Sequence, residues 1–150
     1  MALEQDIGRL ARTRPFDVLP RDALKLIAFS AERRTFPAGR TLFEQNDEAD
    51  CAYFLLSGSV ALTAYGKDEP QERVVGAGAL IGEMAMFAPL ARPASARTKE
   101  ETAALRIPRH LMARVLSEYP REAAQIRAQL AERTRQITAE FEAVRQRARL

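Results

Sequence analysis

Residues 81–87 read IGEMAMF, and residues 92–96, four positions further on, read RPASA. The first stretch predicts the start of a short helix that carries the carboxylate of Glu83, and Arg92 follows nine residues later. A helix start offers unpaired backbone N–H groups to an anion, and an arginine adds a planar fork of donors that matches phosphate oxygens. A carboxylate accepts hydrogen bonds from hydroxyls but repels phosphate. The two stretches therefore predict a site for a small ligand that carries both a phosphate and a sugar hydroxyl.

Short apolar or alternating runs surround these two stretches. The runs that predict strands are residues 34–36, 41–43, 53–56, 60–65, 73–75 and 103–107. Turn-forming residues separate them, at 37–39 (PAG), 46–47 (ND), 57–58 (SG), 66–68 (GKD) and 76–78 (GAG). Many short strands with close turns are typical of an antiparallel sandwich or barrel. We therefore expect a β-barrel over residues 34–108, interrupted by the short helix.

Helical patterns lie on both sides of this region. Residues 3–10 and 23–30 are expected to be helices, and a third helix is expected after Pro108, ending at Tyr119-Pro120. A long helix is expected to begin at about Arg121. The predicted fold is α+β in a single domain of residues 1–150: N-terminal helices in residues 1–33, the barrel in 34–108 and C-terminal helices in 109–150.

A seam of mostly apolar residues recurs at spacings of four and three along the predicted last helix. They are Leu130, Thr134, Ile137, Phe141, Val144 and Ala148. About two and a half heptads are fewer than the three to four that indicate a coiled coil. The helix therefore either packs back on its own barrel or forms a homodimer. We favour the dimer, because the seam extends well past the last barrel contact that one helix can make.

Composition points to an ordinary cytoplasmic protein. No apolar run approaches the roughly 20 residues of a membrane span, the N-terminus lacks a signal-peptide core, and the single Cys51 cannot form an intrachain disulfide. The net charge of +3 resides in the last 30 residues, which hold seven Arg and four Glu. Interleaved acids favour a solvated helix face over a nucleic-acid-binding arm.

The chain lacks the residues of the common enzymatic sites. His110 is the only histidine, which argues against a metal-dependent β-barrel enzyme with several histidine ligands. Cys51 is predicted to be a small apolar strand residue, since nothing basic lies near it in the sequence to activate it. No Ser-His-Asp set can be assembled. We therefore expect a non-enzyme without metal or cofactor.

Taken together, these motifs resemble the cyclic nucleotide-binding domain family of catabolite-activator-type regulators, cyclic-nucleotide-gated channels and protein kinase A regulatory subunits. The resemblance covers roughly residues 16–137. The segments that carry it are 37–40 (PAGR), 43–50 (FEQNDEAD, with Asn46 where glycine is usual), 53–60 (YFLLSGSV), 76–78 (GAG) and 82–85 (GEMA), with Arg92 at the family spacing. It implies a jelly-roll-like, double-stranded β-helix barrel and identifies residues 81–96 as a phosphate-binding cassette.

The resemblance also implies roles for the cassette. Glu83, after Gly82, would accept from the ribose 2′-hydroxyl, and Arg92 would pair with an equatorial oxygen of the cyclic phosphate. The backbone N–H groups of Met84 and Ala85 would point at the same phosphate.

Other implied contacts concern the base. Ser95, which follows Ala94, would reach the phosphate or a purine edge. Thr138, beside Ile137, and Thr134, one turn earlier, would face the base across a dimer. The implied ligand is cAMP, and the hydroxyl of Ser95 is compatible with cGMP as well.

Pro93 departs from the family pattern. The residue after the arginine usually donates its backbone N–H to the phosphate, and proline has no such donor. Losing one hydrogen bond to a charged group costs about 1.5–3 kcal/mol, or roughly tenfold to more than a hundredfold in affinity. Pro93 therefore predicts weakened binding.

The expected function is a sensor in which a cyclic nucleotide orders the cassette and repositions the C-terminal helix toward an unidentified effector protein. One alternative is a nucleotide-independent dimerisation module with a vestigial pocket. Another is the sensor part of a transcription regulator. Activator-type relatives carry a helix-turn-helix domain after the long helix, where this sequence stops, so DNA binding is not expected from these residues alone.

Overall fold

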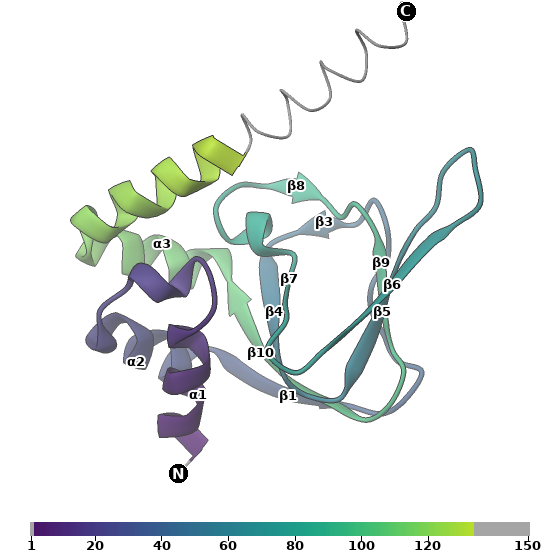
Figure 1. Cartoon of the computed structure of the whole chain (residues 1–150), viewed down its shortest axis with the longest axis horizontal. Coiled ribbons are helices and arrows are strands. Elements are labelled where there is room, and N and C mark those ends of the chain that lie inside the picture. Colours follow the sequence, from purple (N-terminus) through teal and green to yellow (C-terminus); the bar gives the residue numbers. More distant parts are fainter. Residues whose placement is uncertain (1, 134–150) are drawn as a thin grey trace, which may run out of the picture.

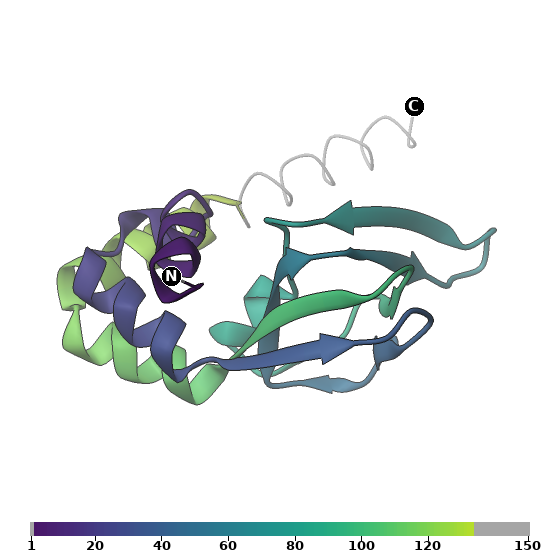
Figure 2. The same ribbon diagram turned by 90° about the horizontal axis from the view of Figure 1, so that it is seen from below.

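The computed structural model describes residues 2–133 and places a group of helices against one end of a β-barrel (Figures 1 and 2). The helical elements are α1 (Ala2–Ala11), the 3-10 helix η1 (Phe16–Val18), α2 (Arg21–Ser30), the 3-10 helix η2 (Glu83–Met86) and α3 (Arg109–Glu118). A further helix occupies residues 120–133, and we term it the C-terminal helix. The strands are β1 (Glu32–Phe36), β2 (Thr41–Phe43), β3 (Glu48–Ala49), β4 (Cys51–Ser57), β5 (Ser59–Ala64), β6 (Gln71–Gly76), β7 (Leu80–Ile81), β8 (Leu90–Ala91), β9 (Ser95–Thr98) and β10 (Thr102–Pro108).

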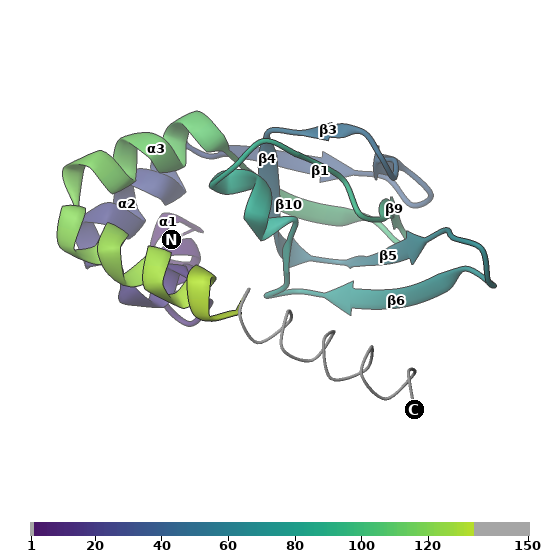
Figure 3. The same cartoon turned by 90° about the horizontal axis from the view of Figure 1, so that it is seen from above.

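The strands of the described residues form two four-stranded antiparallel sheets and one small ribbon. The sheet orders are β1-β10-β4-β7 and β2-β9-β5-β6, and β3 pairs with β8. Figure 3 shows β6 beside β5, at the edge of the second sheet. A core that includes Tyr53, Leu55, Val60 and Ala96 fills the barrel. This arrangement confirms the predicted antiparallel jelly-roll barrel with helices on both sides of it in the sequence.

Strand β4 is buried on both faces, which explains its continuous apolar sequence. Cys51, Tyr53 and Leu55 belong to the barrel core, whereas Phe54 and Leu56 belong to the core beneath the helices. Alternate residues of a strand point to opposite faces. The central strand β4 therefore joins the helical layer to the inside of the barrel.

The helices share one apolar core with the outer face of β4 and β10. Ile7 of α1, Ile27 of α2 and Val115 of α3 are all fully buried in it. The C-terminal helix contributes Ile126, which has no exposed surface. The helix predicted from about Arg121 begins one residue earlier, directly after Tyr119.

An ion pair between a buried aspartate and a partly exposed arginine ties the first helix to the barrel. Asp6 of α1 is 4% exposed and accepts a hydrogen bond of 2.5 Å from Arg33 of β1.

Strand β1 begins at Glu32, two residues before the predicted run of residues 34–36. The change from helix to strand thus occurs at Ala31.

Two turns have the backbone that their sequences predict. Gly58 adopts φ 87°, and a Cβ there would collide with the hydroxyl of Thr102 and the carbonyl of Glu101. Asn46 adopts φ 76°, the left-handed region that asparagine tolerates better than most side chains. This conformation explains why asparagine can stand where the family usually has glycine.

Several expectations concern residues outside the described range. Thr134, Thr138 and the seam beyond Leu130 lie there, so the dimer and the base contacts stay predictions. Among the described residues, none of the helices is long and apolar enough to cross a bilayer.

Candidate functional site

The cassette begins with a glycine in the left-handed conformation. Gly82 has φ 72° and leads into η2, whose Ala85 and Met86 are buried while Met84 is 38% exposed. The Ala85 N–H donates to the Gly82 carbonyl at 3.1 Å, so this amide is engaged within the turn. The short helix predicted after Gly82 is therefore present, as a 3-10 turn anchored on its apolar side.

Arg92 is buried without a counter-charge. It is 4% exposed, its Nη2 donates to the Cys51 carbonyl at 2.8 Å, and its Cζ lies 4.1 Å from the centroid of the Phe43 ring. Its Nε and Nη1 are buried and have no hydrogen-bond partner, and no ion pair of the described residues includes Arg92. Burying a charge without a partner is costly. The site therefore favours an anion at these two nitrogens.

The backbone on both sides of the Arg92 side chain is held by a neighbouring loop. The Arg92 N–H donates to the Asp47 carbonyl, and the Arg92 carbonyl accepts from the Asn46 N–H, both at 2.8 Å. A Cβ at Gly82 would overlap Nη1 of Arg92. The fold thus brings Gly82 and Arg92 together, and only glycine leaves room for the guanidinium.

Glu83 faces the C-terminal helix. Its side chain is 17% exposed and forms an ion pair with Arg133. Both residues line a cavity of about 610 Å³ between η2, the Arg14–Pro15 segment and the C-terminal helix. In the sequence, Arg133 is one arginine of a basic tail, and no local pattern shows which tail residue reaches the cassette.

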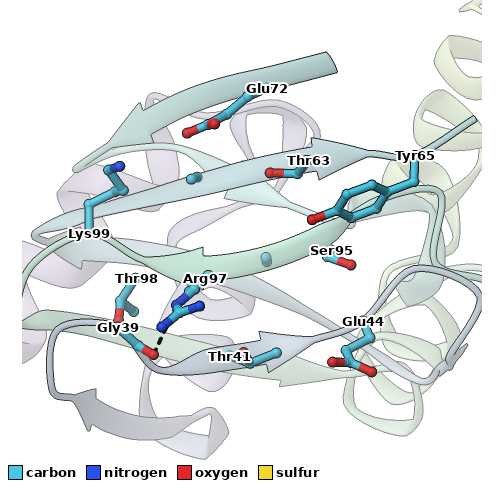
Figure 4. A pocket seen from close by; sticks show the side chains of 12 residues that line it. Gly39, Thr41, Glu44, Thr63, Tyr65, Glu72, Ser95, Arg97, Thr98 and Lys99 are labelled. Carbon is cyan, nitrogen blue, oxygen red and sulfur yellow. Dashed lines mark hydrogen bonds between the residues drawn. The ribbon is translucent and has the colours of Figure 1, made fainter. Parts of the chain in front are cut away.

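Ser95 lies on a different surface. Ala96 points into the barrel core, so its strand neighbours Ser95 and Arg97 face outward. Figure 4 shows Ser95 beside Thr63 and Tyr65 in a second cavity, of about 520 Å³. The Ser95 hydroxyl accepts from the Gln45 N–H at 2.8 Å. The structure therefore does not bring Ser95 into the cavity of Glu83.

Pro93 and Ala94 form the bend between Arg92 and β9. Pro93 is exposed and Ala94 is half-buried. The bend allows Arg92 to point inward while the next strand begins with Ser95 facing outward.

An aromatic group completes the buried side of the site. The Phe43 ring contacts Arg92 and stacks on Tyr53, with ring centroids 6.1 Å apart. Burial raises the pKa of the Tyr53 hydroxyl, and the neighbouring Cys51 raises it further. Tyr53 is therefore uncharged at neutral pH and offers Arg92 no negative charge. Neither Phe43 nor Cys51 was singled out as a site residue, because only the tertiary fold places them against Arg92.

Comparisons with known proteins concern the domain that carries this site. A family model described as cyclic nucleotide-binding domain matches residues 33–119. A solved structure of a cyclic nucleotide-binding-like protein from Brucella abortus is 38% identical, with a TM-score of 0.70 over 75% of this chain and 98% of that one.

Two curated relatives are longer than this chain. A cyclic AMP receptor protein from Thermus thermophilus is 33% identical over 113 residues, which are 74% of this chain and 52% of that protein. A lysophospholipase from Aspergillus terreus is 30% identical over 122 residues, 80% of this chain but 8% of that protein. The chain thus spans about half of the first relative and less than a tenth of the second. The activity of either full-length relative therefore does not describe this chain.

Replacing Arg92 with methionine tests whether the guanidinium is structural. We expect the free energy of unfolding of Arg92→Met, measured by urea denaturation without ligand, to stay within about 1 kcal/mol of wild type. Exchanging a buried charge for an apolar side chain of similar volume is often neutral or stabilising, which offsets the lost bond to the Cys51 carbonyl. A loss above about 2 kcal/mol would mean that Arg92 mainly supports the fold.

Proposed function

Because the chain belongs to the cyclic nucleotide-binding domain family, we propose that it is a sensor of cAMP that reports occupancy through its C-terminal helix. The observation that carries this proposal is the buried guanidinium of Arg92, whose Nε and Nη1 have no partner. A cyclic phosphate carries one negative charge and equatorial oxygens that can accept from such a fork. In a buried site this charge-assisted bond is stronger than in water.

Glu83 supports recognition of the sugar. Its carboxylate lies one residue after Gly82, at the start of the same 3-10 turn. A carboxylate accepts from a ribose 2′-hydroxyl, a hydrogen bond that a ligand without this hydroxyl cannot make. Glu83 and Arg92 thus provide one acceptor and one donor for the two different edges of a cyclic nucleotide.

The ion pair between Glu83 and Arg133 supports coupling to the C-terminal helix. A ribose hydroxyl at Glu83 must share or replace the contact with Arg133. Ile126 holds the same helix against the core of α1, α2 and α3. A ligand shifts the equilibrium between two positions of the C-terminal helix only by the difference between its affinities for them. A contact at Glu83 that changes on binding would supply such a difference.

The choice of cAMP follows from the relatives and from Ser95. The Thermus thermophilus relative is a cyclic AMP receptor protein. A hydroxyl at Ser95 would be compatible with cGMP, but this hydroxyl faces the second cavity and accepts from Gln45. It therefore offers no specific contact that favours cGMP.

Titration calorimetry with cAMP and cGMP tests the proposal. We expect wild type to bind cAMP and Arg92→Met to bind at least about a hundredfold more weakly, since two charge-assisted hydrogen bonds are lost. Arg97→Met is the matched control, because Arg97 is an exposed arginine that faces the second cavity. It should bind like wild type. The absence of heat with either nucleotide at millimolar concentration would instead favour the nucleotide-independent module.

Pro93 should limit the affinity. Pro93→Ala restores a backbone N–H after Arg92, and we expect cAMP to bind about tenfold to a hundredfold more tightly. Pro89→Ala is the control, because Pro89 is an exposed proline in the same segment. Equal dissociation constants for Pro93→Ala and wild type, measured by calorimetry, would show that this amide position makes no contact with the ligand.

Amide hydrogen exchange of residues 120–133 tests the coupling. We expect saturating cAMP to change the exchange of this segment in wild type, and to change it less than half as much in Arg133→Met. Arg127→Met is the control, since Arg127 is exposed on the same helix and does not line the Glu83 cavity. A full response in Arg133→Met would exclude the Glu83–Arg133 pair as the link.

A further inference from the structure

Cys51 places a thiol against the same guanidinium that serves the proposed phosphate site. Its Sγ accepts a hydrogen bond from Nη2 of Arg92 at 3.4 Å, beside the 2.8 Å bond to the Cys51 carbonyl. Cys51 is 2% exposed and is the only cysteine of the sequence. The contact joins a nucleophilic atom to a buried cation that has two further unpaired nitrogens.

Two guanidinium groups lie near the thiol. Arg92 touches the sulfur, and Arg106 on the neighbouring strand β10 interacts with Cys51 as well. The remaining groups are the Tyr53 hydroxyl, which is uncharged at neutral pH, and Asp50, whose carboxylate pairs with Arg106 at 3.4 Å. Nearby guanidinium groups stabilise a thiolate and raise its reactivity. Arg92 forms no ion pair with a carboxylate of the described residues, and its hydrogen bond to another side chain is to the sulfur of Cys51.

We propose that Cys51 is an oxidation-sensitive thiol whose sulfenate occupies Arg92 and excludes the cyclic phosphate. The exclusion of the cyclic phosphate by the sulfenate rests on the proposed function. The reactivity of the thiol does not, because it depends on the contact between Cys51 and Arg92. An oxygen added to Sγ would be a further acceptor next to Nη2 of Arg92, the nitrogen that the sulfur already contacts. Phosphate and sulfenate would then compete for the same guanidinium group.

The oxidant is a hydroperoxide, and hydrogen peroxide is the smallest. The thiolate sulfur attacks one peroxide oxygen, the O–O bond breaks, and the leaving hydroxide takes a proton from solvent to become water. Sulfur loses two electrons and the peroxide gains them, so Cys51 becomes a sulfenic acid or its anion. Thiol reagents reverse this step.

The thiol and the guanidinium are both shielded from solvent. Cys51 and Arg92 are both buried, so either a peroxide or a phosphate must enter through a local opening beside Arg92. Such openings occur in folded proteins at a lower free energy than global unfolding. A nucleotide bound at Arg92 would close this opening. Oxidation of Cys51 and nucleotide binding therefore oppose each other.

Trapping of the sulfenic acid tests the proposal. The protein is treated with hydrogen peroxide and dimedone, and adduct formation is followed by intact mass. Dimedone is needed because oxygen added at the exposed Met84 would give the same mass change as sulfenic acid. We expect wild type and Arg97→Met to be labelled at the same rate and Arg92→Met at least tenfold more slowly. Equal rates in Arg92→Met and wild type would overturn the proposal.

A second arm measures cAMP binding. Saturating cAMP should slow labelling of wild type at least tenfold, and peroxide should weaken cAMP binding at least tenfold until dithiothreitol restores it. Cys51→Ser should keep the same dissociation constant before and after peroxide. Unchanged binding by oxidised wild type would overturn the exclusion. If reduced wild type binds no cAMP, the proposed function fails, while the dependence of labelling on Arg92 still decides whether the thiol is activated.

Discussion

The buried guanidinium of Arg92 is the constraint on which the site depends. Several distant segments combine to hold it: the loop at Asn46 and Asp47 fixes its backbone, the Cys51 carbonyl takes one nitrogen, and the Phe43 ring covers its plane. Gly82 leaves the space on its remaining side. A charge held in this way without a counter-ion destabilises the ligand-free protein. This destabilisation of the ligand-free protein is expected of a site that a bound anion completes.

The same arrangement connects the ligand site to the helices. Glu83 stands at the start of the turn that Gly82 opens, and its carboxylate reaches Arg133 on the C-terminal helix. That helix is anchored by Ile126 in the core that also contains Phe54 of β4. Strand β4 in turn provides Cys51 beneath Arg92. On the proposed function, changes at the cassette would reach the helices through the Glu83–Arg133 pair and through the central strand.

Sequence patterns identified the longer strands and helices but not the shortest ones. Strands β3, β7 and β8 have two residues each, too few to show a period of two. Strand β9 (SART) was not recognised, because it has a single apolar side chain, Ala96. The role that the family resemblance implies for Ser95 depends on which face of β9 is buried. That face depends on pairing with β2 and β5, which are distant in the sequence.

By itself, the sequence determined the order of helices, barrel and helices, and the spacing of Gly82, Glu83 and Arg92 within one segment. These features are local: they follow from turn residues, periodicity and a conformation that only glycine adopts readily. Only the tertiary structure decided that Arg92 lies against Cys51 and Phe43, and that Arg133 is the tail residue that meets Glu83. Burial and pairing of charges depend on neighbours brought together by folding, so no local pattern contains them.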